Sequence, residues 1–134
     1  MFVTCLADLF RPSVAFASIR LLEQAGCIVT VPMQQTCCGQ PAYNTGDYDA
    51  AIPVARQVIA TFESADYVVV PSGSCAAMIN HHYPKLLEGE WRQRAIALAA
   101  KTFELTTFLA EIAAPIPAAE PIERAVTYHD SCAG

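Results

Sequence analysis

The sequence has little positive charge, no long apolar run and no basic leader. Lysine and arginine number 8 against 13 aspartate and glutamate residues, and the net charge of −5 argues against nucleic acid as a partner. No stretch approaches the roughly 18–20 consecutive apolar residues of a membrane span, so we expect no direct membrane insertion. The opening segment MFVTCLADLFRP lacks the basic start of a secretion signal and carries Asp8. These absences favour a cytoplasmic protein.

The chain also lacks the paired Cys-x-x-C motifs of common zinc sites, although it contains six cysteines. Its 134 residues suffice for one domain with a real core, and its hydrophobic content of 54% is high. In a reducing compartment, cysteines serve more often as metal ligands or redox groups than as structural disulfides. The cysteines are therefore the first candidates for function.

Short apolar runs alternate with helical patterns along the chain. Strands are expected over 1–5, 27–32, 66–71 and 125–130, and helices over 11–26, 46–65, 74–87 and 90–113. The helix over 74–87 is expected to be interrupted before Pro84, and a break near Thr106 is an alternative for the helix over 90–113. A proline-rich connector, 114–123, precedes the last expected strand. This order predicts an α/β fold with an open, mainly parallel sheet of about four strands and helices on both faces.

Most of the cysteines fall at the ends of the expected strands. In open α/β sheets, functional sites form beyond the carboxyl ends of the strands. Cys27 differs because it begins a strand, and we expect it to be a small buried hydrophobe. The cysteines expected to point toward one edge of the sheet are Cys5, Cys37, Cys38, Cys75 and Cys132.

The segment QQTCCGQP, residues 34–41, places two cysteines side by side before a glycine. Neighbouring cysteines rarely bond to each other, because the ring that they would close is strained. They also cannot easily bind one metal ion together, whereas they can span two metals of a cluster. Gly39 lets the backbone turn and approach a bulky ligand closely. This pattern favours a soft-metal or iron–sulfur site over a single zinc ion.

The cysteine spacing resembles that of the cysteine-rich CCG family. Cys5 is followed by 31 residues (6–36), Cys-Cys-Gly, 33 residues counted from Gly39 (39–71), and then SGSC. The family's module has a cysteine, a long gap, Cys-Cys-Gly, a second long gap and Cys-x-x-C. It occurs in heterodisulfide reductase, in the iron–sulfur subunit of glycolate oxidase and in lactate-utilisation proteins. The segments CCGQPAYNTG and PSGSCAAMINHHYP are most similar to lactate-utilisation iron–sulfur oxidoreductase subunits.

This resemblance implies a domain organisation and partners. The family usually carries the module twice, so residues 1–124 are expected to form the first module and 125–134 the start of a second. TYHDSCAG, 127–134, then supplies Cys132 as a ligand of that second module. We expect a fragment or N-terminal half. The implied partners are the missing second module and other subunits of a lactate-utilisation or hydroxy-acid oxidase complex.

The resemblance also implies a cofactor and its ligands. Ser72 stands where the family has the first cysteine of Cys-x-x-C. Cysteines at the remaining positions suffice for a [4Fe–4S] cluster, with the Ser72 oxygen and the Gly39 turn as further candidates. Because Ser72 replaces a cysteine, electron transfer is carried over from the family rather than disulfide cleavage. The implied metal ligands are Cys5, Cys37, Cys38 and Cys75.

Two other functions use the same residues. A zinc-bound structural or interaction module would need the same thiolates, with zinc as the alternative cofactor. A hydrolase would use Cys75 as the nucleophile at a strand-to-helix turn, with His129 and Asp130 completing a triad. The hydrolase leaves Cys37 and Cys38 without a role, and Ala77 stands where the nucleophile-elbow pattern has glycine.

Overall fold

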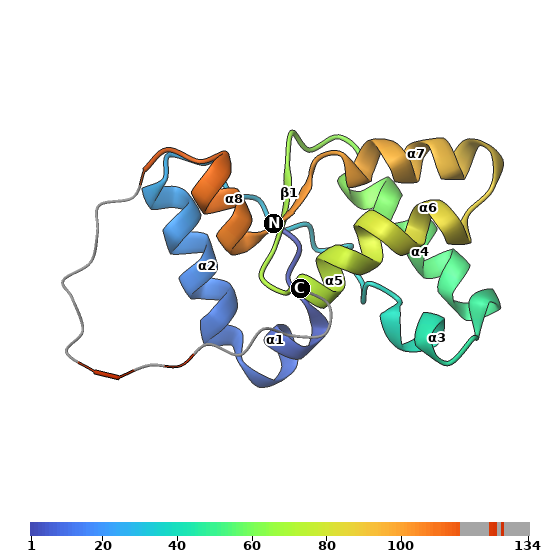
Figure 1. Cartoon of the computed structure of the whole chain (residues 1–134), viewed down its shortest axis with the longest axis horizontal. Helices are drawn as coiled ribbons and strands as arrows, with labels where there is room; N and C mark the ends of the chain where they lie inside the picture. Colours follow the sequence, from blue (N-terminus) through green and yellow to red (C-terminus); the bar gives the residue numbers. More distant parts are fainter. Residues whose placement is uncertain (116–123, 126, 128–134) are drawn as a thin grey trace.

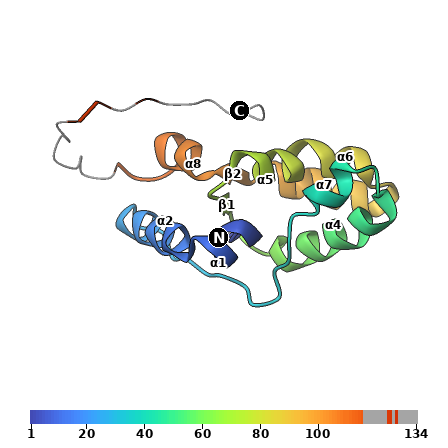
Figure 2. The same cartoon turned by 90° about the horizontal axis from the view of Figure 1, so that it is seen from below.

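A small parallel sheet lies at the centre of the fold. The structure, a computed structural model, describes residues 1–115, 124, 125 and 127. Strand β1 (Val68–Val70) pairs in parallel with β2 (Thr102–Glu104), with Val69 opposite Phe103. Helices lie on both sides of the two strands (Figures 1 and 2). The α/β class is confirmed, and the sheet of the described residues has two strands.

Strand β1 separates two hydrophobic cores. All three of its residues are buried, as the apolar run YVVV predicts. Because side chains alternate along a strand, Val68 and Val70 enter one core and Val69 enters the other. The first core contains side chains from three helices, α4 (Tyr48–Phe62), α5 (Gly73–Ala77) and α7 (Gly89–Ala99). The second contains side chains from α2 (Pro12–Gln24) and α8 (Leu105–Glu111).

The first helices follow an extended N-terminal segment. Helix α1 (Cys5–Phe10) begins where the Thr4 side chain accepts a hydrogen bond from the Ala7 amide. Helix α2 (Pro12–Gln24) has its proline in the first turn, and Gly26 follows its end with φ +83°. Proline is favoured in the first turn of a helix and glycine just after its end, and the helix expected over 11–26 is confirmed.

Helices α3 and α4 follow the two neighbouring cysteines. Helix α3 (Gln40–Asn44) is one short turn that the sequence did not predict. Helix α4 (Tyr48–Phe62) was expected over 46–65, and the Asp47 side chain caps it by accepting from the Ala50 amide. Pro53 lies inside this helix, where it has no amide hydrogen to donate to the Asp49 carbonyl.

The helix expected over 74–87 is present but changes its winding. It consists of α5 (Gly73–Ala77), a π-helical turn (Met78–His82) and α6 (Tyr83–Leu86). Pro84 has no amide hydrogen to donate to the Asn80 carbonyl, so a regular α-helix cannot continue through this point. The wider π turn immediately before Pro84 accommodates this loss.

The helix expected over 90–113 is interrupted over residues 100–104, just before the position near Thr106 at which a break was the alternative. The chain instead forms α7 (Gly89–Ala99), strand β2 and α8 (Leu105–Glu111). Because helical patterns flank the three residues that pair with β1, the sequence did not indicate a strand there. Glu104 ends the strand and caps α8, because its carboxylate accepts from the amides of Thr106 and Thr107.

The expected sheet of about four strands is not confirmed. Residues 1–4 and 27–32 are extended without forming strands. They still lie in strand-like positions, since the Phe2 amide donates to the Val69 carbonyl at 2.9 Å. The N-terminal ammonium donates to the Thr30 carbonyl at 2.6 Å, which replaces a regular ladder between these two segments. Apart from Ala125 and Thr127, the strand expected over 125–130 lies outside the described residues.

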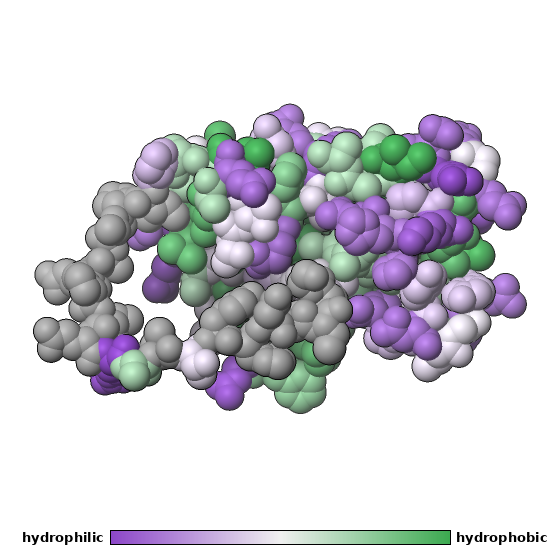
Figure 3. Space-filling model, in the orientation of Figure 1, coloured by the Kyte–Doolittle hydropathy of each residue, from purple (hydrophilic) through white to green (hydrophobic). Residues whose placement is uncertain are grey.

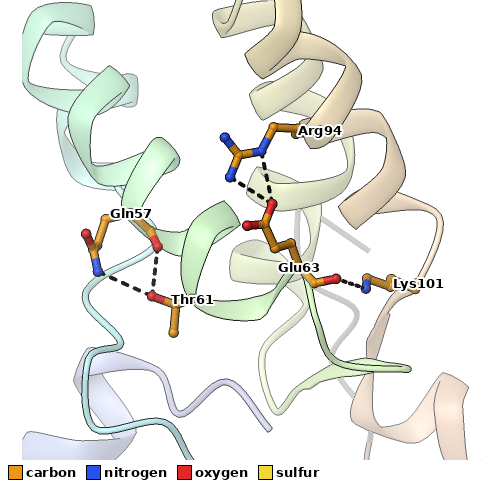
Figure 4. A network of polar contacts seen from close by, with 5 residues as sticks. All are labelled: Gln57, Thr61, Glu63, Arg94 and Lys101. Carbon is orange, nitrogen blue, oxygen red and sulfur yellow. Dashed lines mark hydrogen bonds and ion pairs between the residues drawn. The ribbon is translucent and has the colours of Figure 1, made fainter.

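The carboxyl end of α4 is fixed by polar contacts from α7 and from the residue before β2 (Figure 4). The Arg94 guanidinium donates twice to one Glu63 carboxylate oxygen, at 3.0 and 2.8 Å. The Lys101 ammonium donates to the Glu63 carbonyl at 2.6 Å and also to the Ala65 carbonyl. These contacts satisfy carbonyls at a helix end that the helix itself cannot bond.

Candidate functional site

Four cysteines meet in two pairs. The Cys5 and Cys37 sulfurs are 3.7 Å apart, and the Cys38 and Cys75 sulfurs are 3.3 Å apart. The neighbouring cysteines therefore point to different partners, one at the start of α1 and one in α5. The structure brings together four of the five cysteines that the sequence placed at one edge of the sheet.

The turn after the neighbouring cysteines depends on Gly39. Its φ of +80° lies in the left-handed region that disfavours side chains. A Cβ atom at this position would also lie 3.3 Å from Cγ1 of Val54 in α4. The Gly39 carbonyl then accepts from the Tyr43 amide at 3.0 Å, which starts α3. Glycine is therefore required by both the turn and the packing against α4.

A buried tyrosine at the start of α6, Tyr83, hydrogen-bonds to the backbone of this turn. The Tyr83 hydroxyl donates to the Cys38 carbonyl at 2.8 Å, and the Tyr83 side chain is fully buried. Burial, followed by the nearby Cys38 sulfur, raises the pKa of Tyr83. Sequence reasoning missed this residue, because nothing local distinguishes a tyrosine before Pro84 from an ordinary core aromatic.

The two thiol pairs differ in exposure. Cys38 is 2% exposed and Cys75 is 8% exposed, and both belong to the first hydrophobic core. Cys5 and Cys37 are only partly buried. The site therefore extends from the core at Cys38 and Cys75 toward the surface at Cys5 and Cys37.

The two thiols of the buried pair differ in how easily they ionise. A hydrogen bond from the Cys38 thiol lowers the pKa of Cys75 to about 6, with help from the Ser72 and Ser74 hydroxyls and against the opposing effect of burial. The same hydrogen bond, together with burial, raises the pKa of Cys38. The pair thus favours one thiolate, on Cys75, and one thiol, on Cys38.

In the outer pair, the ionisation of Cys5 is disfavoured. Burial, followed by the hydrogen bond with Cys37, raises the pKa of Cys5.

Ser72 is the residue immediately before α5, and its hydroxyl lies 3.3 Å from that of Ser74. Ser72 therefore lies beside Cys75, where the family resemblance places it.

The donors in this site suit a soft metal or a metal–sulfur cluster. Four thiols, two of them buried in the first core, form a donor set that such groups prefer. Among residues 1–115, 124, 125 and 127, no three His, Cys, Asp or Glu side chains are grouped so as to hold a single metal ion. Cys27 packs against the second core instead of joining the site. Cys132 lies outside the described residues.

The alternative triad around Cys75 is only partly visible. His129 and Asp130 lie outside the described residues. Of the two other histidines, His81 is exposed. The Nδ1 atom of His82 lies 3.1 Å from the Tyr43 hydroxyl. The groups that contact Cys75 here are another thiol and two serine hydroxyls.

Comparison with known proteins identifies relatives along nearly the whole chain. Proteins named "Lactate utilization protein A" from Halalkalibacterium halodurans and Exiguobacterium sp. are each 48% identical over 98% of this chain. "Lactate utilization protein A 2" from Bacillus cereus is 41% identical over the same share. The matches cover 54%, 55% and 55% of those proteins, so the chain spans about half the length of the curated relatives it matches. No solved structure matches significantly.

The family profile covers the site itself. The cysteine-rich domain called CCG matches residues 1–80, a span that contains all four paired cysteines. A cysteine-rich domain of this kind indicates metal or cluster binding. Within the part of the chain that the structure describes, no helix has the length and apolarity needed to cross a membrane. The match over more than half of the chain shows that the protein belongs to the cysteine-rich CCG domain family.

Proposed function

We propose that this chain is an iron–sulfur electron-transfer module of an oxidoreductase that acts on lactate or a related 2-hydroxy acid. The observation that supports this most directly is the meeting of four thiols in two contacting pairs. The substrate class is inferred from relatives named "Lactate utilization protein A". The role suits a reducing compartment such as the cytoplasm, where the thiols remain free to bind metal.

The four paired cysteines, Cys5, Cys37, Cys38 and Cys75, would hold the cluster, and four thiolates match the ligand number of a [4Fe–4S] group. When bound, such a cluster exchanges single electrons at a potential set by its charge, hydrogen bonds and exposure. The lowered pKa of Cys75 favours the thiolate that metal binding requires. The Ser72 and Ser74 hydroxyls would supply hydrogen bonds beside that ligand.

The protein surroundings of the site differ between its two sides. The core side chains around Cys38 and Cys75 exclude water from the inner pair. The partly buried outer pair, Cys5 and Cys37, leaves the other side near the surface. A redox partner could approach the site from that outer side without disturbing the core.

Oxidation of a 2-hydroxy acid to its 2-oxo acid releases two electrons and two protons. We assign that step, with its protons, to other subunits of the complex, and the transfer of electrons to this chain. We take L-lactate as the first candidate for that 2-hydroxy acid, because the relatives are named for lactate utilization.

We also propose that the exposed apolar face of α1 and α2 packs against a second CCG module. Side chains on this face are 62–73% exposed, although each is strongly apolar: Leu6, Leu9, Phe10 and Phe16. Hydrophobic atoms lie at the lower edge of the molecule, where α1 lies in Figure 1 (Figure 3). The relatives are nearly twice as long as this chain, which leaves room for such a module. A buried interface would cover this apolar surface.

A redox titration tests the electron-transfer proposal. The chain is reconstituted anaerobically with ferrous iron and sulfide, and its visible absorption is followed while the potential is lowered and raised. We expect absorption that bleaches on reduction and returns on oxidation, in the wild type and in Cys27→Ser. A chain that binds iron and sulfide but shows no reversible change would contradict electron transfer.

A further inference from the structure

We propose that Tyr83 is a positioning residue that fixes the peptide after Cys38 so that the Cys38 thiol faces Cys75. The inference extends the proposed function to a residue that does not itself bind metal. It rests on the proposed function only for its biological use, because the geometry that it explains involves only atoms of the chain itself. Tyr83 acts through the backbone of the turn that Cys38 and Gly39 form.

The hydrogen bond from Tyr83 joins two elements that are far apart in the sequence. Tyr83 begins α6, and its hydroxyl donates to the Cys38 carbonyl at 2.8 Å across 45 residues of chain. The ring is fully buried in the first core, so its position is set by packing on all sides. Packing of the ring therefore fixes the position of the Tyr83 hydroxyl. The Cys38 carbonyl can accept its hydrogen bond only when the carbonyl is oriented toward that hydroxyl.

The peptide between Cys38 and Gly39 needs such a restraint. Glycine accepts backbone conformations of either sign of φ at little cost, so this peptide can rotate more easily than its neighbours. The observed φ of +80° at Gly39 is one of those conformations. Rotation would turn the Cys38 carbonyl away and move the Cys38 side chain relative to Cys75. Tyr83 stabilises the orientation in which the two sulfurs are 3.3 Å apart.

The π-helical turn explains how Tyr83 reaches this position. Cys75 and Tyr83 are eight residues apart on one continuous helical segment. In a regular α-helix they would differ by roughly 80° around the axis. The π turn over Met78–His82 winds less per residue, which brings Tyr83 back toward the face that carries Cys75. Cys75 contacts the Cys38 sulfur while Tyr83 holds the Cys38 carbonyl.

The test uses Tyr83→Phe, which removes the hydroxyl and keeps the ring. Tyr67→Phe is the matched control, because its ring packs against Phe103 and Phe108 on the side of the second core, away from the four paired cysteines. The reduced, metal-free full chain is treated anaerobically with diamide. This azo compound takes two electrons and two protons from a thiol pair, giving a disulfide and a hydrazine. Mass spectrometry of linked peptides then follows the Cys38–Cys75 disulfide over time.

We expect Tyr83→Phe to form the Cys38–Cys75 disulfide roughly fivefold more slowly than the wild type, the change that follows from losing one typical buried hydrogen bond. Tyr67→Phe should match the wild type. The Cys5–Cys37 disulfide is an internal reference and should form at the same rate in all three chains. A purely structural role would slow both disulfides or neither. Equal Cys38–Cys75 rates in folded Tyr83→Phe and wild type would overturn the proposal.

A second measurement applies if Tyr83→Phe does not fold. In the wild-type chain, nuclear magnetic resonance should detect a slowly exchanging Tyr83 hydroxyl proton close to Gly39. A hydroxyl proton that exchanges as fast as that of exposed Tyr67 would equally overturn the proposal. Both measurements use metal-free protein, so their failure would leave the cluster proposal untouched, and failure to bind iron would leave the Tyr83 proposal untouched.

Discussion

At the scale of single residues, the neighbouring cysteines divide the site into an inner and an outer half. Cys38 turns into the core to meet Cys75, while Cys37 meets Cys5 nearer the surface. Two adjacent residues can do this only if the backbone between and after them is fixed. Gly39 makes the turn possible and the packing of Val54 against it leaves little space for any other residue.

Gly39→Ala should destabilise the chain more than Gly46→Ala. Both glycines have φ +80°, so each substitution should cost about 1–2 kcal/mol of unfolding free energy from backbone strain. Only at position 39 would the new methyl group also meet Val54, which adds roughly 1 kcal/mol. Urea denaturation measures the difference. Combining Gly39→Ala with Val54→Ala should remove part of the excess, and equal losses at both glycines would contradict this account.

Cys75 should ionise far below an ordinary thiol. Its pKa of about 6 means that the thiolate appears as the pH rises through 6 and is largely formed at neutral pH. Ultraviolet absorbance of the metal-free chain should show one thiolate with this midpoint, which Cys75→Ser removes. Because the Cys38 thiol donates the main stabilising hydrogen bond, Cys38→Ala should move the midpoint upward. A Cys75 midpoint near that of an ordinary thiol would show that the pair does not form in solution.

At the scale of elements, local signals predicted some segments well and others poorly. Helices α2 and α4 were predictable because Pro12 and Asp47 mark their starts. Strand β1 was predictable from its apolar run. Strand β2 was not, because its three residues lie between two helical patterns and become a strand only by pairing with β1. Tertiary context decided that assignment, as it often does for short strands.

The edge segments show a second limit of local signals. Residues 27–31 alternate as a strand would, with Cys27, Val29 and Val31 packed against the second core and Ile28 fully open to solvent. Their side chains therefore follow the predicted pattern. A strand also needs a ladder of backbone hydrogen bonds, and the apolar pattern contains no information about those bonds.

Lys101→Met should loosen the junction between α4 and β2. The substitution keeps the apolar stem and removes the ammonium that binds the Glu63 and Ala65 carbonyls. We expect a loss of about 1–2 kcal/mol in unfolding free energy, because two carbonyls at a helix end lose a charged donor. Lys85→Met is the control, since Lys85 is exposed. If both variants unfold at the same urea concentration, the hydrogen bonds of the Lys101 ammonium contribute nothing measurable to the free energy of unfolding.

At the scale of the whole molecule, the sheet separates two cores, and the cysteines lie where the first core meets the surface. The sequence predicted this gathering of Cys5, Cys37, Cys38 and Cys75, although fewer strands formed than expected. The gathering persists because the segment before Cys5 lies beside β1, where the Phe2 amide donates to the Val69 carbonyl, and Cys75 follows β1 along the chain. Tyr83 was beyond prediction, because its role depends on a contact across 45 residues.

The exposed apolar face of α1 and α2 should make the isolated chain self-associate. Leu9 and Phe10 are 73% and 72% exposed, which is unusual for such side chains on one short helix. Sedimentation velocity should show association that rises with concentration, and Leu9→Lys with Phe10→Lys should reduce it. The exposed Glu90→Lys is the control for added charge. A wild-type chain that stays monomeric at high concentration would argue against an interface on this face.

The most direct test of the central claim is chemical analysis after anaerobic purification. Iron, acid-labile sulfide and zinc are measured per chain in the wild type, in Cys38→Ser and in Cys27→Ser, whose cysteine lies outside the site. A [4Fe–4S] site predicts about four irons and four sulfides per wild-type chain, retained in Cys27→Ser and lost in Cys38→Ser. Zinc without iron or sulfide would contradict the electron-transfer account and leave a zinc-bound structural module in its place.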